Sequence, residues 1–279
     1  MPELPEVEVI AISINSYLIN NKLTELWTSN KRLRSQLSKN ECQILTNQRV
    51  TKVFRRAKFL VIELENSWLL FHFGMTGRMF VSKNKKDVFL SKHKHIHFSL
   101  KAELNYIYFQ DVRRFGGIYF VKKTTPTDHF DSQVSFQLGV EPLSEKFNSN
   151  FLYFKSRNIN QSIKTWLMSG RYIAGIGNIY ASEALFRAGI SPDTKTKSLG
   201  LTRSSRLVSA IKYVLIEAIR CGGSTIKDYA SINGKPGGYS KNHLVYGKKN
   251  KLCPICLKTL SMKYICQRSS FYCKKCQKK

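Results

Sequence analysis

The sequence predicts an α+β protein with a β-rich N-terminal part, a helical C-terminal part and a final hairpin that binds a metal. Residues 22–121 contain short segments rich in aromatic and β-branched residues, which indicate antiparallel strands. Residues 151–220 carry apolar side chains at helical spacing. Two Cys-x2-Cys pairs follow near the C-terminus. A chain of 279 residues is long enough to form two domains, each with its own core.

The N-terminal part is expected to begin with an amphipathic helix over residues 5–20. Its apolar side chains recur at helical spacing, at Val7, Ile10, Ala11, Ile14 and Leu18. A proline suits the first turn of a helix, and glutamates complement its positive end. Strands are then predicted at Val50–Leu64, Trp68–Phe73, His95–Leu100, Leu104–Phe109 and Ile118–Val121. Polar residues interrupt this pattern at Glu65–Ser67 and Lys83–Asp87, where we expect a turn and a loop.

The C-terminal part is predicted to be helical after a connection without clear periodicity at residues 122–150. Helices are expected at Ser162–Met168, Ile179–Ala188 and Leu201–Arg220, and a glycine pair ends the last one. Residues 231–242 are rich in Gly, Ser and Lys and predict a loop. We therefore divide the chain into a β-rich domain at 1–135, a hinge at 136–150, a helical domain at 151–240 and a cysteine-rich domain at 241–279.

The charge of the chain indicates a polyanionic partner. There are 46 basic and 18 acidic residues, a net charge of +28, which favours nucleic acid or an acidic membrane surface. Residues 229–279 contain twelve Lys or Arg and no acid. Three glutamates precede any apolar run, so no secretory signal is predicted, and no stretch is apolar enough to span a bilayer.

Four of the seven cysteines have the spacing of a zinc ribbon. Cys253-x2-Cys256 and Cys273-x2-Cys276 are separated by sixteen residues, the length of a short hairpin. Four thiolates complete a tetrahedron and leave no open position, so a single structural zinc ion is expected. The alternative is a set of reduced thiols without a metal. Basic and aromatic residues in the hairpin suit a DNA groove, although they could also form a solvated face.

Other motifs allow both a chemical and a structural interpretation. If Met1 is removed, Pro2 carries a free secondary amine with a pKa of about 7.7–8.0. Glu3 beside it is a possible proton donor or acceptor. The simpler alternative is that these residues only start a helix. Likewise, Gly175-Ile176-Gly177-Asn178 can bind a phosphate or only cap a helix, with Asn178 as the N-cap.

Together, the motifs resemble the bacterial formamidopyrimidine-DNA glycosylase family over essentially the whole chain. The matching segments are Pro2–Glu8, Arg56–Lys58, His72–Gly77, Arg113–Gly116, Ile163–Met168, Ala174–Glu183, Asn233–Gly237, Val245–Gly247 and the four-cysteine ribbon. The resemblance implies an N-terminal two-sheet β-sandwich with flanking helices, a helical domain with a helix–two-turn–helix motif, a mobile loop at 224–240 and a C-terminal zinc ribbon. It also implies a cytoplasmic bacterial monomer that binds damaged double-stranded DNA between its domains and has no membrane partner.

The resemblance implies a bifunctional enzyme of base excision repair that removes oxidised purines such as 8-oxoguanine and formamidopyrimidines. The Pro2 amine forms a Schiff base, and β- and δ-elimination leave a one-nucleoside gap. The implied catalytic residues are Pro2, Glu3 and Lys58, and zinc is held by Cys253, Cys256, Cys273 and Cys276. The residues implied to bind phosphates are Lys58, His72, Asn178 and Arg268. Lys164 is implied to lie near the damaged base. The residues implied to fill the space left by base flipping are Met75, Arg113 and Phe115.

Three other functions compete with this one. An endonuclease VIII-like enzyme for oxidised pyrimidines shares the amine and the zinc, but typically starts Pro-Glu-Gly-Pro-Glu, whereas Leu4 stands here. A non-catalytic zinc-ribbon protein would not need a free Pro2. A basic membrane-surface protein would need a basic amphipathic helix, which the sequence lacks. The chain also departs from the family at Ser169-Gly170-Arg171 and Asn158–Gln161, so the resemblance does not imply the local geometry of these two loops.

Overall fold

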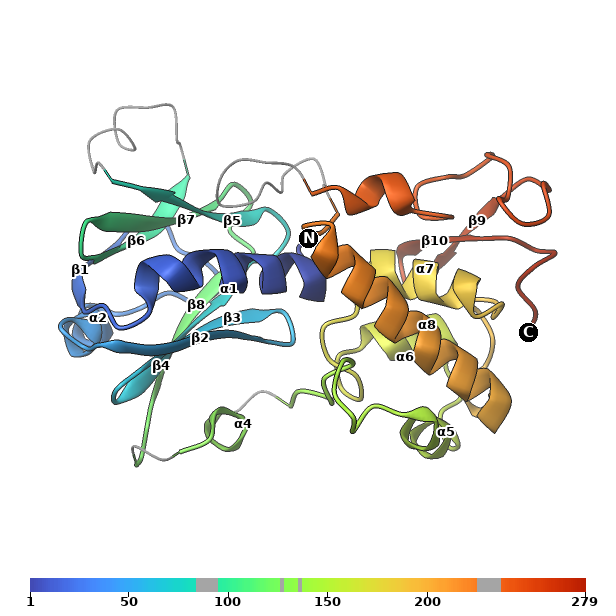
Figure 1. Cartoon of the computed structure of the whole chain (residues 1–279), viewed down its shortest axis with the longest axis horizontal. Coiled ribbons are helices and arrows are strands. Elements are labelled where there is room, and N and C mark those ends of the chain that lie inside the picture. The colour runs from blue at the N-terminus through green and yellow to red at the C-terminus, as the bar shows by residue number, and fades with distance from the viewer. Residues whose placement is uncertain (84–94, 126–127, 135–136, 225–236) are drawn as a thin grey trace. The chain divides into compact units, whose positions relative to one another are not determined.

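The computed structural model describes residues 1–83, 95–125, 128–134, 137–224 and 237–279, which form two compact units (Figure 1). The first unit comprises Met1–Phe136 and Cys221–Gly238, and the second comprises Gln137–Arg220 and Tyr239–Lys279. This division groups the cysteine hairpin with the helices, and it assigns 221–238 to the first unit, whereas our boundaries assign that segment to the helical domain. Most of the expected mobile loop, residues 225–236, and most of the polar loop at 83–87 lie outside the described residues.

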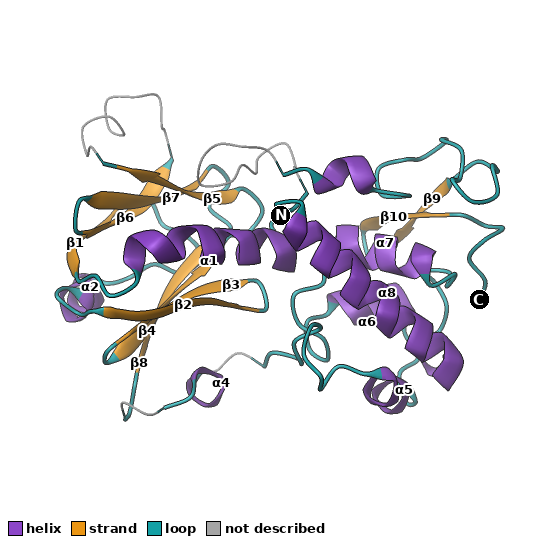
Figure 2. Ribbon diagram, in the orientation of Figure 1, coloured by secondary structure: helices purple, strands orange, loops and turns teal. Residues whose placement is uncertain are grey.

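The first unit contains two four-stranded antiparallel sheets, as expected (Figure 2). One has the order β1 (Leu23–Thr28), β6 (Ile96–Ala102), β7 (Asn105–Asp111), β5 (Gly77–Ser82). The other has the order β2 (Val50–Arg56), β3 (Phe59–Leu64), β4 (Ser67–His72), β8 (Gly117–Lys122). The segment predicted as Val50–Leu64 is thus a hairpin of two strands, and the sequence did not reveal β1 and β5. The large apolar core joins residues from both sheets, including Phe71 of β4 and Phe98 of β6.

Helix α1 (Leu4–Leu18) supplies the same core from its buried face, through Val7, Ile10, Ala11, Ile14 and Leu18. The helix begins at Leu4 and has Pro5 in its first turn, which agrees with the helical periodicity of the sequence. Glu6 is fully buried, and its carboxylate accepts hydrogen bonds from the backbone of Glu3 at 2.8 Å and of Ser224 at 2.8 Å. Within the described residues, this unit also contains helices α2 (Lys39–Leu45) and the short α4 (Phe130–Gln133).

The second unit is built from helices α5 (Ser149–Ser156), α6 (Ile163–Met168), α7 (Asn178–Arg187) and α8 (Leu201–Arg220), with 3-10 turns at Thr196–Ser198 and Tyr239–Asn242. A hairpin of β9 (Ser261–Ile265) and β10 (Arg268–Tyr272) completes it. The three predicted helices are confirmed. Among the described helices, none is both long and apolar enough to cross a bilayer.

One buried carboxylate connects α7 to the chain that leads into the hairpin. Glu183 is fully buried, and its two carboxylate oxygens accept hydrogen bonds from three successive backbone N–H groups. The donors are Leu244 at 2.8 Å, Val245 at 3.0 Å and Tyr246 at 2.8 Å. Because hydrogen bonds to an ionised acceptor are stronger than neutral ones, this connection fixes the start of the cysteine-rich segment on the helices.

We expect Glu183→Gln to lower the free energy of unfolding by about 2–4 kcal/mol, because it removes the charge from a buried acceptor and offers an N–H group to backbone donors. Urea denaturation followed by circular dichroism measures the change. The matched control is Glu217→Gln, which breaks a partly exposed ion pair with Arg220 on the same unit and should cost less than about 1 kcal/mol. Equal effects of the two substitutions would contradict the structural role of Glu183.

Candidate functional site

Pro2 and Glu3 lie at the N-terminus of α1, and both are buried. Glu3 is the N-cap residue of the helix and is 2% exposed. Its backbone N–H donates to Glu6, so the first residues are held by the helix that follows them. With Met1 in place, the Pro2 nitrogen is part of an amide and is not a nucleophile. The helix therefore holds the backbone at position 2 in place. The Pro2 nitrogen can act as an amine only after Met1 has been removed.

Lys58 and His72 lie at the same end of the second sheet. Lys58 stands in the turn between β2 and β3, directly before Phe59, which pairs with His72 across the sheet. Burial lowers the pKa of His72 to about 4, and the positive charges of Lys58 and Arg34 contribute to this shift. The His72 Nδ1 accepts a hydrogen bond from Gly74 N at 3.2 Å, so the ring proton is on Nε2. At neutral pH, His72 is therefore an uncharged hydrogen-bond donor.

Met75, Arg113 and Phe115 come together from two neighbouring turns of the first unit. Met75 is in the turn between β4 and β5, and the other two are in the turn between β7 and β8. The turns touch: a Cβ atom on Gly74 would lie 2.5 Å from the backbone nitrogen of Gly116. The Arg113 guanidinium is 4.8 Å from the centre of the Phe115 ring, and Phe115 is 43% exposed. Arg113 and Phe115 thus form an exposed cation–aromatic pair, and the half-buried Met75 lies on the adjoining turn.

The carboxylate of Asp111 holds these two turns, and the sequence did not reveal this role. Asp111 is fully buried. Its Oδ1 accepts from the Thr76 hydroxyl and from Arg113 N at 3.2 Å, while Oδ2 accepts from Gly116 N at 2.7 Å. The only signal in the sequence is an acid two residues before an Arg-Arg-Phe-Gly turn, which does not identify its partners.

Lys164 is buried in the second unit and contacts the hairpin. It is the second residue of α6 and is 1% exposed. Its Nζ donates to the Ser269 carbonyl at 2.8 Å and to the Ser270 hydroxyl at 2.7 Å. Both acceptors belong to β10, so Lys164 connects the helices to the strand that starts at Arg268.

Asn178 is the first residue of α7, and Gly177 is the N-cap, so the prediction that Asn178 caps this helix is wrong. The helix starts one residue earlier because Gly177 has the extended backbone of a cap, with φ −127° and ψ −155°. The Asn178 Oδ1 is buried and lacks a hydrogen-bond partner within the described part of the chain. Oδ1 is an acceptor and cannot bind an anion, so a phosphate at this helix N-terminus would need the Nδ2–H group or backbone N–H groups as donors.

Arg268 is exposed at the tip of the hairpin, where the strands meet in a two-residue turn. The turn residues Cys266 and Gln267 both have positive φ, 45° and 58°, as type I′ hairpin turns require. Arg268 follows directly as the first residue of β10. The hairpin thus presents one arginine at its end, on a scaffold whose base is the cysteine cluster.

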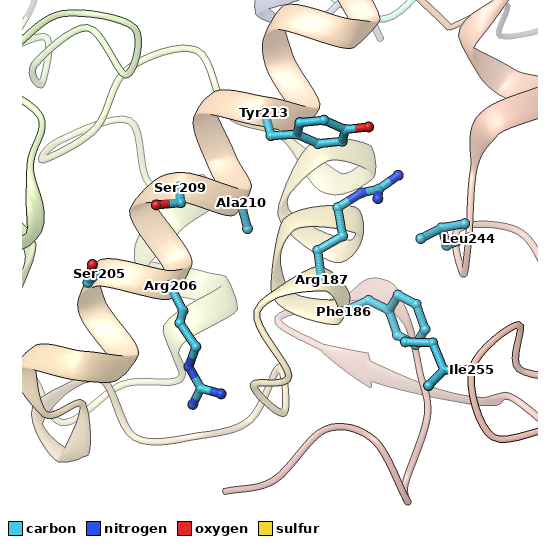
Figure 3. Close-up of a pocket in the computed structure, with 9 residues that line it drawn as sticks. All are labelled: Phe186, Arg187, Ser205, Arg206, Ser209, Ala210, Tyr213, Leu244 and Ile255. Carbon is cyan, nitrogen blue, oxygen red and sulfur yellow. The ribbon is translucent and has the colours of Figure 1, made fainter.

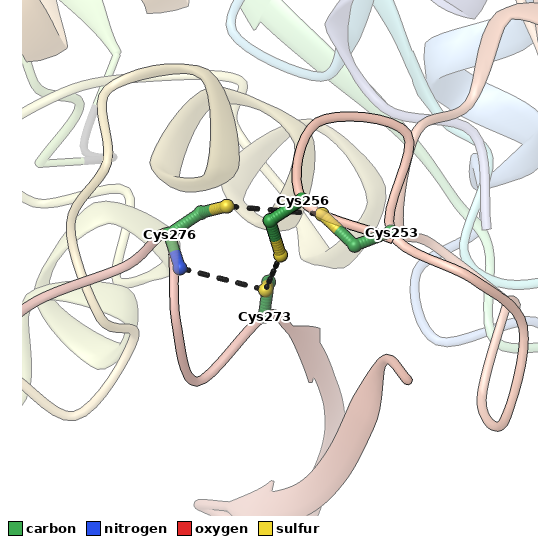
Figure 4. Close-up of side chains that lie close together, drawn as sticks. All are labelled: Cys253, Cys256, Cys273 and Cys276. Carbon is green, nitrogen blue, oxygen red and sulfur yellow. Dashed lines mark hydrogen bonds between the residues drawn. The ribbon is translucent and has the colours of Figure 1, made fainter. Parts of the chain in front are cut away.

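The four predicted ligand cysteines converge at the base of the hairpin (Figure 4). The Sγ atoms of Cys253, Cys256, Cys273 and Cys276 all lie within 4.8 Å of one another, and Cys266 is outside the cluster. The distances are 3.8 Å between Cys253 and Cys276 and 3.5 Å between Cys256 and Cys273. A tetrahedral site with metal–sulfur bonds of about 2.3 Å has sulfur–sulfur edges of about 3.8 Å. The cluster could therefore hold a metal ion.

Two family models match the chain, and their order follows its two structural parts. The formamidopyrimidine-DNA glycosylase N-terminal domain matches residues 1–118, and the formamidopyrimidine-DNA glycosylase H2TH domain matches residues 138–230. A formamidopyrimidine-DNA glycosylase of Vesicomyosocius okutanii is 40% identical over 278 residues, which cover 99% of this chain and 100% of the relative. One of Proteus mirabilis is 40% identical over 277 residues, with 99% and 98% covered.

Solved structures agree with the sequence comparison. The crystal structure of the MutM (Fpg) protein of Thermus thermophilus has a TM-score of 0.85 and 33% identity, covering 99% of this chain and 98% of that one. A complex of Lactococcus lactis Fpg with DNA containing an abasic site has a TM-score of 0.88 and 27% identity, with 99% and 100% covered. By sequence over its full length and by fold, this chain belongs to the formamidopyrimidine-DNA glycosylase family.

Proposed function

We propose that this DNA glycosylase of base excision repair removes oxidised purines from damaged double-stranded DNA and then cleaves the strand as a lyase. The observation that carries the proposal is Pro2-Glu3 at the buried start of α1, within a domain that matches the family model. The related Lactococcus lactis protein was crystallised with DNA containing Fapy-dG and with DNA containing an abasic site. A base lesion and its abasic product are the substrates of two successive steps.

The chemistry follows from a secondary amine at position 2. Once Met1 is gone, the Pro2 nitrogen attacks C1′ of the damaged nucleotide, and the bond from C1′ to the base breaks. Opening of the sugar ring, with Glu3 as the proton donor, leaves an iminium that is positively charged without needing a proton. That iminium withdraws electrons as the 3′ phosphate and then the 5′ phosphate depart by β- and δ-elimination. Hydrolysis frees the amine and leaves a one-nucleoside gap.

Phosphates flanking the flipped nucleotide would be held by Lys58, His72, Asn178 and Arg268. A lysine and an arginine supply positive charge, and a neutral His72 supplies the Nε2–H donor described above. The wedge of Met75, Arg113 and Phe115 would enter the stack, where apolar and cationic surfaces replace the contacts of the flipped base. The exposure of Phe115 supports the assignment, because a buried side chain could not enter DNA.

The cysteine cluster would hold one structural zinc ion. Four thiolates leave no position for a substrate, so the metal's contribution is to fold the hairpin. Glu183 and Lys164 hold that hairpin against the helices. We propose that Lys164 supports phosphate binding by Arg268 through these contacts with β10. An endonuclease VIII-like preference for pyrimidines is disfavoured by Leu4 and by the wedge group, and comparing excision of 8-oxoguanine with that of oxidised pyrimidines decides between the two.

Borohydride reduction tests the role of Pro2. With duplex DNA that carries 8-oxoguanine opposite cytosine, the protein lacking Met1 should form a covalent adduct, because borohydride reduces the iminium to a stable amine. Pro2→Gly that retains Met1, verified by mass, should form none. The matched control is Pro5→Gly, which changes the other proline of this stretch but preserves the amine and should still be trapped. An undiminished adduct in the Pro2 variant would exclude the mechanism.

The state of His72 can be measured by a pH titration of its ring signals by nuclear magnetic resonance, assigned by their loss in His72→Gln. We expect a pKa near 4, because burial and the charge of Lys58 oppose protonation. The folded pKa lies below the unfolded value of about 6.5, so the stability linked to this group is complete above pH 6.5 and is lost as the pH falls toward 4. A midpoint at the unfolded value would show that the ring is not shielded.

Metal analysis tests the cysteine cluster. We expect one zinc ion per chain, lost in Cys273→Ser and retained in Cys266→Ser, because only the first removes a ligand. Loss of zinc should weaken DNA binding, while the two-sheet core of the first unit keeps its circular dichroism. Binding should also weaken steeply with added salt, since several phosphates are neutralised. A Cys273 variant with a full zinc ion, or general unfolding on chelation, would contradict this view.

A further inference from the structure

A pocket of about 550 Å³ opens on the second unit, and none of the residues proposed above for catalysis, DNA or metal lines it (Figure 3). Its walls come from the C-terminal end of α7, the middle of α8 and the segment between Leu244 and Ile255. The side chains combine two arginines, Arg187 and Arg206, with apolar groups that include Phe186 and Tyr213. A ligand that fills this pocket would need both negatively charged and apolar groups.

No acidic side chain of the lining is paired with the arginines of this pocket. Within the described residues, the lining contains no acidic side chain, and neither Arg187 nor Arg206 forms an ion pair. The Arg187 guanidinium lies 5.0 Å from the centre of the Tyr213 ring, which keeps it at the pocket wall. Burial and the nearby charge of Arg206 lower the pKa of Arg203, one turn earlier on α8. A negatively charged ligand would relieve this repulsion.

The apolar part of the pocket is exposed to an unusual degree. Tyr213 is 53% exposed and Ile255 is 68% exposed. Ile255 lies between the first two cysteines of the metal site, and its neighbours Leu252 and Leu257 are also exposed. Phe186 is buried in the small core that includes two of the cluster cysteines. Exposed apolar side chains grouped around a pocket are typical of protein-binding sites.

We propose that this pocket is a docking site for an acidic segment of a partner protein, with carboxylates on the two arginines and an apolar side chain between Tyr213 and Ile255. DNA does not match it, because phosphates cannot use the apolar wall. The pocket also lies at the opposite end of α7 from Asn178, about 13 Å along the helix at 1.5 Å per residue. A site there can recruit a partner while the phosphate-directed end of the helix is occupied.

The test uses the full-length, zinc-loaded protein and a fluorescein-labelled eight-residue peptide of alternating glutamates and leucines. Fluorescence anisotropy should show saturable binding that Arg206→Glu and Ile255→Glu each weaken at least about tenfold, because each places a negative charge in the pocket. Lys146→Glu is the matched control: it changes the charge as Arg206→Glu does, on an exposed part of the same unit, and should alter affinity less than about twofold. Excision of 8-oxoguanine should be unchanged in Arg206→Glu.

Four results would overturn the proposal. These are the absence of saturable binding, an equal loss of affinity in Lys146→Glu, equal binding of a peptide with glutamine in place of glutamate, and displacement of the peptide by undamaged duplex DNA. The second and third would show that charge or apolar character alone attracts the peptide. The fourth would assign the pocket to the DNA-binding surface.

Discussion

Buried carboxylates that accept hydrogen bonds from backbone N–H groups hold the functional segments of this protein in place. Glu6 joins the start of α1 to Ser224, Asp111 holds the two turns of the wedge group, and Glu183 fixes the entry to the cysteine hairpin. An ionised carboxylate in the interior is stable only when its lone pairs are satisfied, and here backbone donors satisfy them. Loops that must bind a ligand are thereby fixed without an extensive core of their own.

The acidic residues that could neutralise the surface are few. The chain has only 18 acidic residues against 46 basic ones, and the three that organise loops are removed from the surface. Few carboxylates therefore remain to neutralise the lysines and arginines that face solvent. For an enzyme that acts on DNA, the large excess of basic over acidic residues favours attraction of the substrate.

The second unit combines two kinds of surface on one small scaffold. Lys164 and Glu183 hold the hairpin with Arg268 at its tip and the four cysteines at its base. The same cysteine segment presents Ile255 to the pocket formed with α7 and α8. The cysteine-rich segment thus carries the hairpin with the exposed Arg268 and also supplies Ile255 to the apolar wall of the pocket. The position of Arg268 and the shape of the pocket therefore both depend on how this segment folds.

The sequence by itself determined the fold class, the first helix, most strands, three helices of the second unit, the cluster of four cysteines and the family. These depend on local periodicity or on fixed spacing, which a single chain displays directly. Only the tertiary structure decided that β1 and β5 are strands, that Gly177 caps α7, that Lys164 contacts β10 and that Asp111 holds the wedge turns. Short strands have weak periodicity. The partners of Lys164 and Asp111 include backbone groups, which every residue carries. Such contacts join segments distant in sequence, so no pattern of side chains along the chain can specify them.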